Sequence, residues 1–366
     1  MAEERQTIHV GKLDKHMKAE STVGGELQWF SPMQTTFQIS GFAWFQEEQT
    51  YRRLPKQPKY EITEAVDILA NCTAGGQIRF RTNATTLRVK VKLQGKANMY
   101  HMPATGECGF DCYIGDPGNQ RFCGVTSYNH SQEQYEANLF ERQEDDSILV
   151  TLHFPLYQGV EKVQIGLNAN AVIQRPPDYD CHKKLIFLWD IHSPRRMCFS
   201  PRNAYTNILS RRFNQEFINL GFSGNGKGEA EMARLIREIE EPACLVLDYE
   251  PNCVSTALYK ETLPRFIQIY RETHPTVPIL VISKYPYAHE RVNSTLQQDR
   301  SERLTFQKQL IQQLQTDGDS HLYFYDGTDL LGENWHEKTV DGSHATDLGF
   351  MSMAEALTPV IRGILK

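Results

Sequence analysis

The chain has 366 residues, of which 40% are hydrophobic and 23% are charged, and its formal net charge is −6 at pH 7. These values are typical of a soluble globular protein with one very large domain or two ordinary ones. The acidic balance, without any Lys/Arg run, argues against a nucleic-acid-binding protein. No apolar run approaches the roughly 18 residues that span a bilayer, so we also expect no membrane partner.

The N-terminal residues indicate the cellular compartment, and the spacing of the cysteines indicates whether a metal site is expected. Residues 1–5, Met-Ala-Glu-Glu-Arg, are polar and lack the apolar core of a signal peptide, which predicts a cytoplasmic protein with reduced thiols. The eight Cys residues are scattered, and the closest two are Cys108 and Cys112. This spacing fits no metal-binding pattern, so we expect no metal. We also expect no cofactor. The sequence is compatible with a homo-oligomer.

Short strands are predicted in the first half of the chain, residues 1–178. Alternating apolar and polar residues, the pattern of half-buried strands, occur at 77–81, 87–93, 147–154 and 163–167. Glycine-containing breaks separate these runs. We therefore predict an antiparallel, jelly-roll-like β-sandwich for residues 1–178. The Gln-Arg-Pro-Pro segment at 174–177 predicts a linker, because proline removes a donor and holds the chain extended.

Aromatic residues cluster early in this half, as Trp29, Phe30, Phe42, Trp44 and Phe45. Their ordinary interpretation is the core of the sandwich. The alternative is a platform for a carbohydrate, because flat aromatic rings offer apolar faces to sugar rings.

The second half, residues 179–366, alternates predicted strands with predicted helices. Near-continuous apolar runs predict five strands, at 184–189, 217–222, 244–248, 278–283 and 322–325. Helices are predicted at 203–213, 228–240, 260–273, 301–315 and 345–365. This alternation predicts a parallel sheet that is covered by helices on both faces. Ligands of such sheets bind at the carboxyl ends of the strands, where the following motifs fall.

The motif Asp341-Gly342-Ser343-His344 lies just before the last predicted helix. An Asp three residues before a His can place its carboxylate against the imidazole Nδ1–H. This fixes the tautomer and leaves Nε2 to act as a general base. The alternative interpretation of so short a motif is a surface turn.

Two further loops follow predicted strands. Residues 221–226, Gly-Phe-Ser-Gly-Asn-Gly, can bring a backbone N–H close to a ligand oxygen, or they can form a flexible turn. Residues 248–252, Asp-Tyr-Glu-Pro-Asn, end in Asn252. Its amide can donate to a developing oxyanion, or it can form an Asx turn beside proline.

Three segments resemble blocks II, III and V of the SGNH/GDSL hydrolases, namely residues 219–226, 247–252 and 339–344. Asp347-Leu-Gly-Phe350 continues the match. The first half is similar to the β-sandwich domain that precedes the catalytic domain in the GxDLY subgroup. Its motif stands here as Gly109-Phe-Asp-Cys-Tyr113, with Cys112 where Leu is usual. The resemblance implies a flavodoxin-like three-layer α/β/α domain, with a five-stranded parallel sheet, at residues 179–366.

The resemblance also implies roles for the site residues. His344 would be the general base and Asp341 its orienting partner, and the Gly224 N–H and the Asn252 side chain would complete the oxyanion hole. The implied activity is Ser-His-Asp hydrolysis of a carboxylic ester, with a carbohydrate ester or a small acyl ester as the substrate. The alternatives are an acyltransferase on the same fold and a catalytically inactive carbohydrate-binding protein.

The family's first block, which carries the nucleophilic serine, is disrupted. Residues 188–198 read Leu-Trp-Asp-Ile-His-Ser-Pro-Arg-Arg-Met-Cys, and Ile191 stands at the nucleophile position, while Ser193 and Ser200 do not fit the block. A one-base shift of the reading frame turns Trp-Asp into Gly and Met-Cys into Cys, and permitted codons complete Tyr-Gly-Thr-Ser-Ile with the serine at position 191. One hypothesis is therefore a local double frameshift over residues 188–202. The other is a genuine inactive variant.

Overall fold

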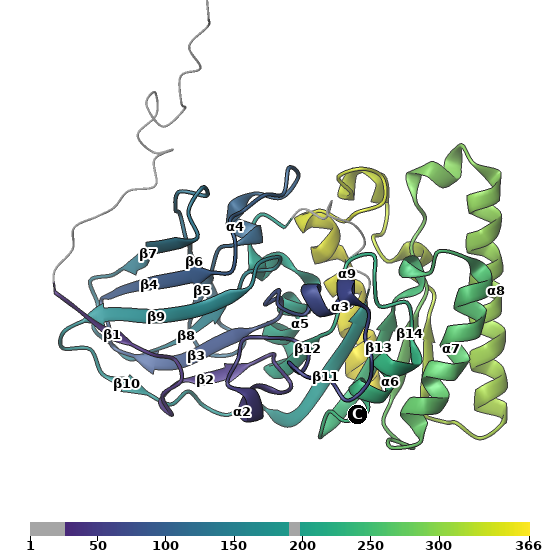
Figure 1. Cartoon of the computed structure of the whole chain (residues 1–366), viewed down its shortest axis with the longest axis horizontal. Coiled ribbons are helices and arrows are strands. Elements are labelled where there is room, and N and C mark those ends of the chain that lie inside the picture. Colours follow the sequence, from purple (N-terminus) through teal and green to yellow (C-terminus); the bar gives the residue numbers. More distant parts are fainter. Residues whose placement is uncertain (1–25, 190–197) are drawn as a thin grey trace, which may run out of the picture.

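A computed structural model of the chain describes residues 26–189 and 198–366. Antiparallel sheets form one side of the molecule, and a parallel sheet between helices forms the other (Figure 1). The predicted fold class is thereby confirmed, both for the antiparallel first half and for the five-stranded parallel sheet of the second.

The sandwich consists of two antiparallel sheets. The four-stranded sheet has the order β1-β9-β4-β7, with β1 at Leu27–Phe30, β4 at Thr86–Leu93, β7 at Gln134–Glu141 and β9 at Val160–Asn168. The second sheet has the order β10-β3-β8-β5-β6, and β2 also pairs with β3. Its strands are β2 (Gln38–Ser40), β3 (Gln77–Thr82), β5 (Asp111–Ile114), β6 (Arg121–Val125), β8 (Ile148–His153) and β10 (Ile173–Gln174). Three short helices lie between these strands, namely α2 (Phe45–Glu48), α3 (Glu64–Leu69) and α4 (Ala104–Glu107).

The core of the sandwich is made by the inward-facing residues of both sheets. Phe80, Val89, Leu152 and Ile165 are completely buried there, as the alternation of apolar and polar residues predicts. Phe42 and Phe45 belong to the same core, with the Phe42 and Phe154 ring centroids 5.3 Å apart. The interpretation of these two aromatics as core residues is therefore confirmed.

The parallel sheet has the strand order β12-β11-β13-β14-β15. Its strands are β11 (Cys181–Trp189), β12 (Gln215–Asn219), β13 (Pro242–Asp248), β14 (Ile279–Ile282) and β15 (Leu322–Tyr325). Counted from β11, this is the flavodoxin-like order 2-1-3-4-5, in which ligands bind where the order reverses, beside the first and third strands. The site is therefore expected at the carboxyl ends of β11 and β13.

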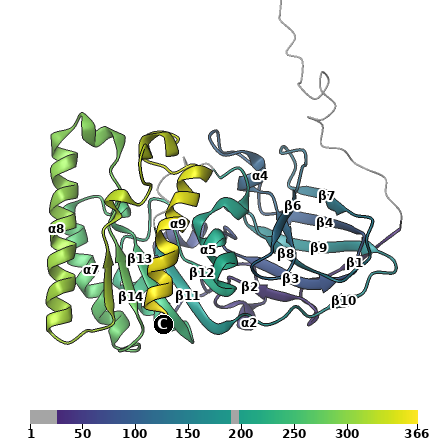
Figure 2. The same ribbon diagram turned by 180° about the vertical axis from the view of Figure 1, so that it is seen from behind.

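Helices cover both faces of this sheet, because successive residues of each strand point to opposite sides. Ile186 and Leu245 face the core under α6 (Ala230–Ile236), α7 (Thr256–Arg271) and α8 (Ser294–Thr316). Phe187 and Val246 face the core under α5 (Tyr205–Phe213) and α9 (Asp347–Ile364). Figure 2 shows α5 and α9 side by side on their face of the sheet.

Several predicted elements have different ends in the structure, and for two of them the reason is a local polar contact. The strand predicted at 217–222 ends at Asn219, because the Asn219 side chain accepts the Gly221 N–H (2.9 Å) and turns the chain. The helix predicted at 301–315 begins earlier, at Ser294. Its N-cap Asn293 accepts the N–H groups of Thr295 and Leu296, at 3.1 and 3.3 Å.

The sandwich half and the parallel sheet share apolar cores. Leu54, Val66 and Ala70 are buried in the core under α6 and α7. Ala74, Met102 and Leu156 are buried in the core under α5 and α9. The interface between the halves is thus packed like a protein interior, which fixes the position of the sandwich relative to the loops of the parallel sheet.

Candidate active site

The loops at the carboxyl edge of the parallel sheet bring the predicted site residues together. Gly224 lies in the loop after β12, and Asn252 lies in the 3-10 helix η3 (Glu250–Asn252) after β13. Asp341 and His344 lie in the loop that leads into α9. All the strand pairs of this sheet are parallel, so these loops meet at the same edge.

The Asp341–His344 pair has the geometry that the spacing predicts. The His344 Nδ1 lies 2.7 Å from Asp341 Oδ2 and 2.8 Å from Oδ1, so Nδ1–H donates to the carboxylate. Asp341 Oδ1 also accepts the backbone N–H groups of Ser343 (3.1 Å) and His344 (3.0 Å). The motif is therefore a tight Asx-type turn that holds the carboxylate against the ring. His344 is buried, with 7% of its surface exposed.

The charge state of Asp341 fits an orienting role. Partial burial acts to raise the pKa of Asp341, but the hydrogen bonds from His344 and Ser343 and the charge of His344 outweigh it. The net pKa lies below the usual value, so this carboxylate is ionised at neutral pH. An ionised Asp341 can hold Nδ1–H and stabilise the imidazolium that forms when Nε2 takes a proton.

Contacts from the β14 loop hold this turn in place. The Tyr285 hydroxyl donates to the Ser343 carbonyl (2.7 Å), and the Ala288 N–H donates to the Gly342 carbonyl (2.7 Å). Gly342 has φ +83°, and a Cβ there would lie 2.5 Å from the Ala288 Cβ. Tyr285 and Ser343 were not predicted as site residues. Ser343 lies inside the recognised motif, whereas only the position of Tyr285 after a predicted strand could have indicated it.

Gly224 has the freedom that an oxyanion donor needs. Its φ is +65°, and no heavy atom lies within 4 Å of an added Cβ. Its N–H has no acceptor among the residues that the structure describes. This N–H is therefore available to a ligand oxygen, and the turn favours glycine.

Asn252, in the loop after β13, is buried against the loop after β12. Its Nδ2 donates to the Gly226 carbonyl at 3.3 Å, which joins the loop of Gly224 to that of Asn252. Because an amide nitrogen carries two hydrogens, the second one remains for a substrate oxygen. The adjacent Glu250 Oε2 accepts the Lys284 N–H (2.9 Å) and so links η3 to the β14 loop. Hydrogen bonds thus join successive loops from Gly226 to His344.

The nucleophile position lies in a segment outside the described residues. Ile191 and Ser193 lie outside the described residues, and β11 ends at Trp189, whose backbone pairs with Asp248 of β13. Ser200 is buried and donates its hydroxyl to Asp111 Oδ2 (2.7 Å), so its oxygen is engaged with the sandwich.

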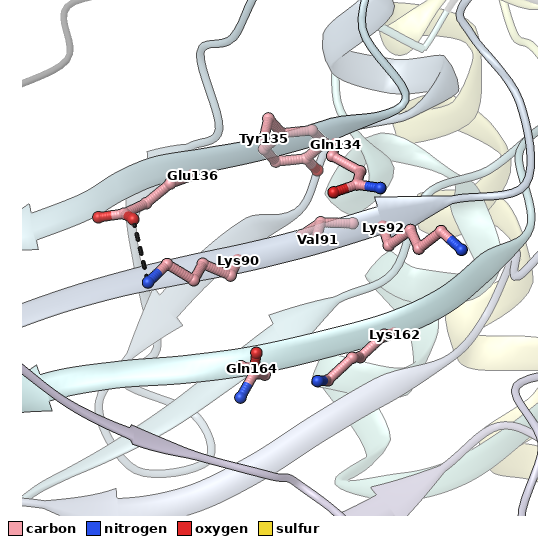
Figure 3. Close-up of a pocket in the computed structure, with 8 residues that line it drawn as sticks. All are labelled: Lys90, Val91, Lys92, Gln134, Tyr135, Glu136, Lys162 and Gln164. Carbon is pink, nitrogen blue, oxygen red and sulfur yellow. Dashed lines mark ion pairs between the residues drawn. The ribbon is translucent and has the colours of Figure 1, made fainter.

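A separate hollow of about 530 Å³ lies on the outer face of the four-stranded sheet (Figure 3). Lys90, Lys92 and Lys162 line it, together with glutamine side chains. Lys90 is 3.5 Å from Glu136 and lies over the Trp29 ring, and Lys92 pairs with Glu161. Because these two lysines already have partners, and the hollow contains none of the predicted site residues, we do not assign chemistry to it.

Neither a metal-binding cluster nor a membrane-spanning helix is found among the described residues. They contain no cluster of three or more His, Cys, Asp or Glu side chains that could hold a metal ion. No helix in the described part of the chain combines the length and apolar character needed to cross a membrane.

Two family models match the chain. Residues 27–173 match the N-terminus of SGNH-hydrolase-type esterases, termed GxDLY, and residues 198–362 match the GDSL-like lipase/acylhydrolase family. The second match begins at Cys198, after the place where the first block was expected. No curated protein matches the chain.

Solved structures with the same fold cover nearly the whole chain. A protein described as a GDSL-like lipase, from Bacteroides ovatus, is 26% identical with a TM-score of 0.84, over 93% of this chain and 98% of that one. A salicylyl-acyltransferase from a tetracycline biosynthetic pathway is 18% identical with a TM-score of 0.75, over 92% and 97%. A family two carbohydrate esterase from Cellvibrio japonicus is 14% identical with a TM-score of 0.61, over 93% and 98%.

Proposed function

We propose that this chain, which belongs to the SGNH/GDSL-type esterases with a GxDLY N-terminal domain, hydrolyses a carboxylic ester by a Ser-His-Asp mechanism. The observation that carries the proposal is the 2.7 Å contact between His344 Nδ1 and Asp341 Oδ2. This pair lies at the same sheet edge as Gly224 and Asn252. A base with its orienting carboxylate and two oxyanion donors are the parts that acyl transfer requires besides the nucleophile.

In this mechanism a serine hydroxyl at position 191 attacks the ester carbonyl carbon, and His344 Nε2 takes its proton. The Gly224 N–H and the free hydrogen of the Asn252 amide bind the carbonyl oxygen as it becomes negative. The tetrahedral intermediate then expels the alcohol, which receives the proton from His344. Water, activated by the same imidazole, hydrolyses the acyl-enzyme and regenerates the hydroxyl.

A carbohydrate ester or another small acyl ester is the proposed substrate. The support is the shared fold with a carbohydrate esterase and with an acyltransferase, together with a sandwich domain that precedes residues 179–366, the proposed catalytic half. An acyltransferase would use the same residues and differ only in excluding water from the acyl-enzyme.

One observation favours a second function for the chain with its present sequence. Ile191 has no nucleophilic atom, and loss of the triad nucleophile costs on the order of 10⁶-fold in kcat in a well-studied protease. A chain that truly carries Ile191 would be nearly inactive and would act by binding an ester or a carbohydrate.

Two steps test the proposal. The gene is first sequenced across codons 186–204, and a continuous frame encoding Tyr-Gly-Thr-Ser-Ile would give the active protein directly. If the bases instead confirm Ile191, an Ile191→Ser variant with the flanking loop restored is made. Hydrolysis of p-nitrophenyl acetate that disappears in a further His344→Ala variant supports the esterase. Absence of both burst and turnover in the restored protein refutes it.

A further inference from the structure

Two buried charged side chains of the N-terminal half reach loops of the catalytic half. Arg53 lies between α2 and α3, and Asp111 is the first residue of β5. Their exposed fractions are 2% and 0%. Burial of a charge is costly, and hydrogen bonds offset that cost, so the partners of these groups show which loops they hold.

Arg53 holds the loop of the oxyanion donor. Its guanidinium donates to the carbonyl of Gly221 and, at 3.5 Å, to that of Asn219, at the start of the loop that contains Gly224. The same group lies 4.7 Å from the centroid of the Phe222 ring. On the other side it donates to the carbonyls of Leu69 (2.7 Å) and Cys72 (2.8 Å) in its own half. The Arg53 guanidinium thus links the backbone of residues 219–221 to the backbone of residues 69–72.

The partners of Arg53 are backbone carbonyls and not carboxylates. No acidic side chain lies within ion-pair distance of it among the described residues. Burial lowers the pKa of Arg53 to about 10, which still leaves it charged at neutral pH. Lysine cannot replace it, because only the planar guanidinium presents five donors in a fixed fork.

Asp111 holds the segment that follows the nucleophile position in sequence. Its Oδ2 accepts the Ser200 hydroxyl (2.7 Å) and the Arg202 backbone N–H. The neighbouring helix α4 adds a contact, since the Thr105 hydroxyl donates to the Phe199 carbonyl (2.6 Å). At Gly106, an added Cβ would lie 2.0 Å from the Cys198 carbonyl oxygen, so the two backbones touch.

The last three residues of the Gly-x-Asp-x-Tyr motif, 111–113, alternate between the two faces of β5. Asp111 and Tyr113 are two residues apart and point toward the catalytic half, where the Arg211 guanidinium lies 4.3 Å from the Tyr113 ring centroid. Cys112 points into the core of the sandwich, where it is completely buried. This explains why an apolar residue is sufficient at that position while the Asp and Tyr have specific partners.

We infer that Arg53 and Asp111 are positioning residues for the proposed esterase. Arg53 sets the backbone of residues 221–226 so that the Gly224 N–H points at the substrate oxygen. Asp111 fixes residues 198–203 at the end of the segment in which the nucleophile is expected. The sandwich domain thereby helps to position the loops of the active site. This inference rests on the proposed function for its catalytic readout.

The kinetic test uses the full chain with a serine at position 191. The variants Arg53→Lys and Asp111→Ala are compared with Arg271→Lys and Asp319→Ala. Arg271 is a matched control, because it also donates to backbone carbonyls (His274, 2.9 Å; Val277, 2.6 Å) and pairs with Asp319, but at the amino-terminal edge of the sheet. We expect kcat for p-nitrophenyl acetate to fall about 100-fold in Arg53→Lys, with KM within about twofold, since a misplaced oxyanion donor costs ~10²-fold or more.

The test compares the kcat of variants that lose similar amounts of thermal stability. All four variants are assayed at least 10 °C below their Tm, a margin on the order of the shifts that single substitutions cause. The inference requires that kcat falls at least tenfold in Arg53→Lys and Asp111→Ala while the two control variants keep the parent value. If kcat falls equally in the controls at equal loss of Tm, the positioning role is wrong.

A second measurement separates this inference from the proposed function. Hydrogen exchange is followed in the chain as it stands, without any requirement for turnover. We expect Arg53→Lys to accelerate exchange of the amides in 221–226, and Arg271→Lys to leave them unchanged. If the restored protein has no esterase activity but this local effect is seen, only the proposed function fails. If exchange in 221–226 does not respond to Arg53→Lys, the inference fails whatever the activity.

Discussion

At the scale of single residues, the Asp341 carboxylate determines which nitrogen of His344 can accept a proton. It receives Nδ1–H at 2.7 Å, and two backbone N–H groups hold it in that position. The tautomer with the proton on Nδ1 leaves the Nε2 lone pair for the nucleophile.

The variant Asp341→Asn tests this arrangement. The amide has nearly the same shape, but its NH₂ group can face Nδ1 and force the proton to Nε2. In the protein with a serine at position 191 we expect kcat to fall ~10⁴-fold while folding is retained. The measurement is kcat with p-nitrophenyl acetate, together with far-UV circular dichroism. Activity within about tenfold of the parent would exclude Asp341 as the orienting residue.

Asp111 illustrates the cost of placing a charge at the interface between the two halves. Burial raises the pKa of Asp111 to about 6, although hydrogen bonds from Ser200 and Arg202 and the charges of Arg211 and Arg202 oppose the rise. The unfolded chain loses this proton near the ordinary pKa of 3.8, before the folded chain does. Between these two values the folded state binds more protons, so the free energy of unfolding falls as pH rises and is level above about 6.

The variant Asp111→Asn should remove this part of the pH dependence. A shift of about two pKa units corresponds to roughly 3 kcal/mol. We therefore expect Asp111→Asn to gain about that much stability relative to the parent between pH 4 and pH 7. Urea unfolding at both pH values measures it, with Asp319→Asn as the control. If the free energies of unfolding of parent and variant differ by the same amount at both pH values, the raised pKa of Asp111 in the folded state is wrong.

At the scale of elements, the strands of the parallel sheet are the ones that the amino-acid pattern predicts best. Runs such as Leu-Val-Leu in β13 are buried on both faces and read as unbroken apolar segments. Strands β5 and β6 were not predicted. Asp111 and Tyr113 on the outward face of β5 pack against the catalytic half, and this interface is not visible in a local pattern.

The residues of the candidate site also differ in whether the local sequence predicts them. The Asp341–His344 contact follows from a spacing of three residues, and Gly224 and Asn252 follow from family blocks. Arg53 could not be predicted, because its partners are carbonyls of Gly221 and Asn219, which carry no side-chain signal. The boundary between 178 and 179 and the catalytic roles stay predictions.

The turn that carries His344 depends on a glycine. Gly342 has φ +83°, and an added Cβ would meet the Ala288 Cβ at 2.5 Å. The variant Gly342→Ala therefore combines ~1–2 kcal/mol of backbone strain with a steric clash. We expect it to lower the free energy of unfolding by ~2–4 kcal/mol and to displace His344, so that kcat falls at least tenfold.

Gly332→Ala provides the control for Gly342→Ala. Gly332 has a similar φ of +68°, but the nearest atom to an added Cβ is the flexible Lys338 Nζ at 3.6 Å. It should show the backbone strain alone and keep the parent kcat. Equal effects of the two substitutions on stability and on kcat would mean that the contact with Ala288 does not position the turn.

At the scale of the whole molecule, the two halves are joined by buried side chains and not by a linker alone. Leu54, Val66 and Ala70 complete the core under α6 and α7, and Arg53 and Asp111 contribute buried hydrogen bonds across the same interface. Chains of this length usually contain domains that can unfold separately. Here, unfolding of the sandwich would expose the apolar faces of the catalytic half and leave several backbone groups unsatisfied.

We therefore expect the full chain to unfold in one calorimetric transition, with the van't Hoff and calorimetric enthalpies equal. The variant Val66→Ala removes a buried contact between the sandwich half and the core under α6 and α7. It should lower the Tm of the single transition by an amount that corresponds to ~1–3 kcal/mol. Val172→Ala is the control, because Val172 is 53% exposed and should leave Tm unchanged. Two resolved transitions, of which Val66→Ala moves only one, would show that the halves are independent and that their shared core contributes little to stability.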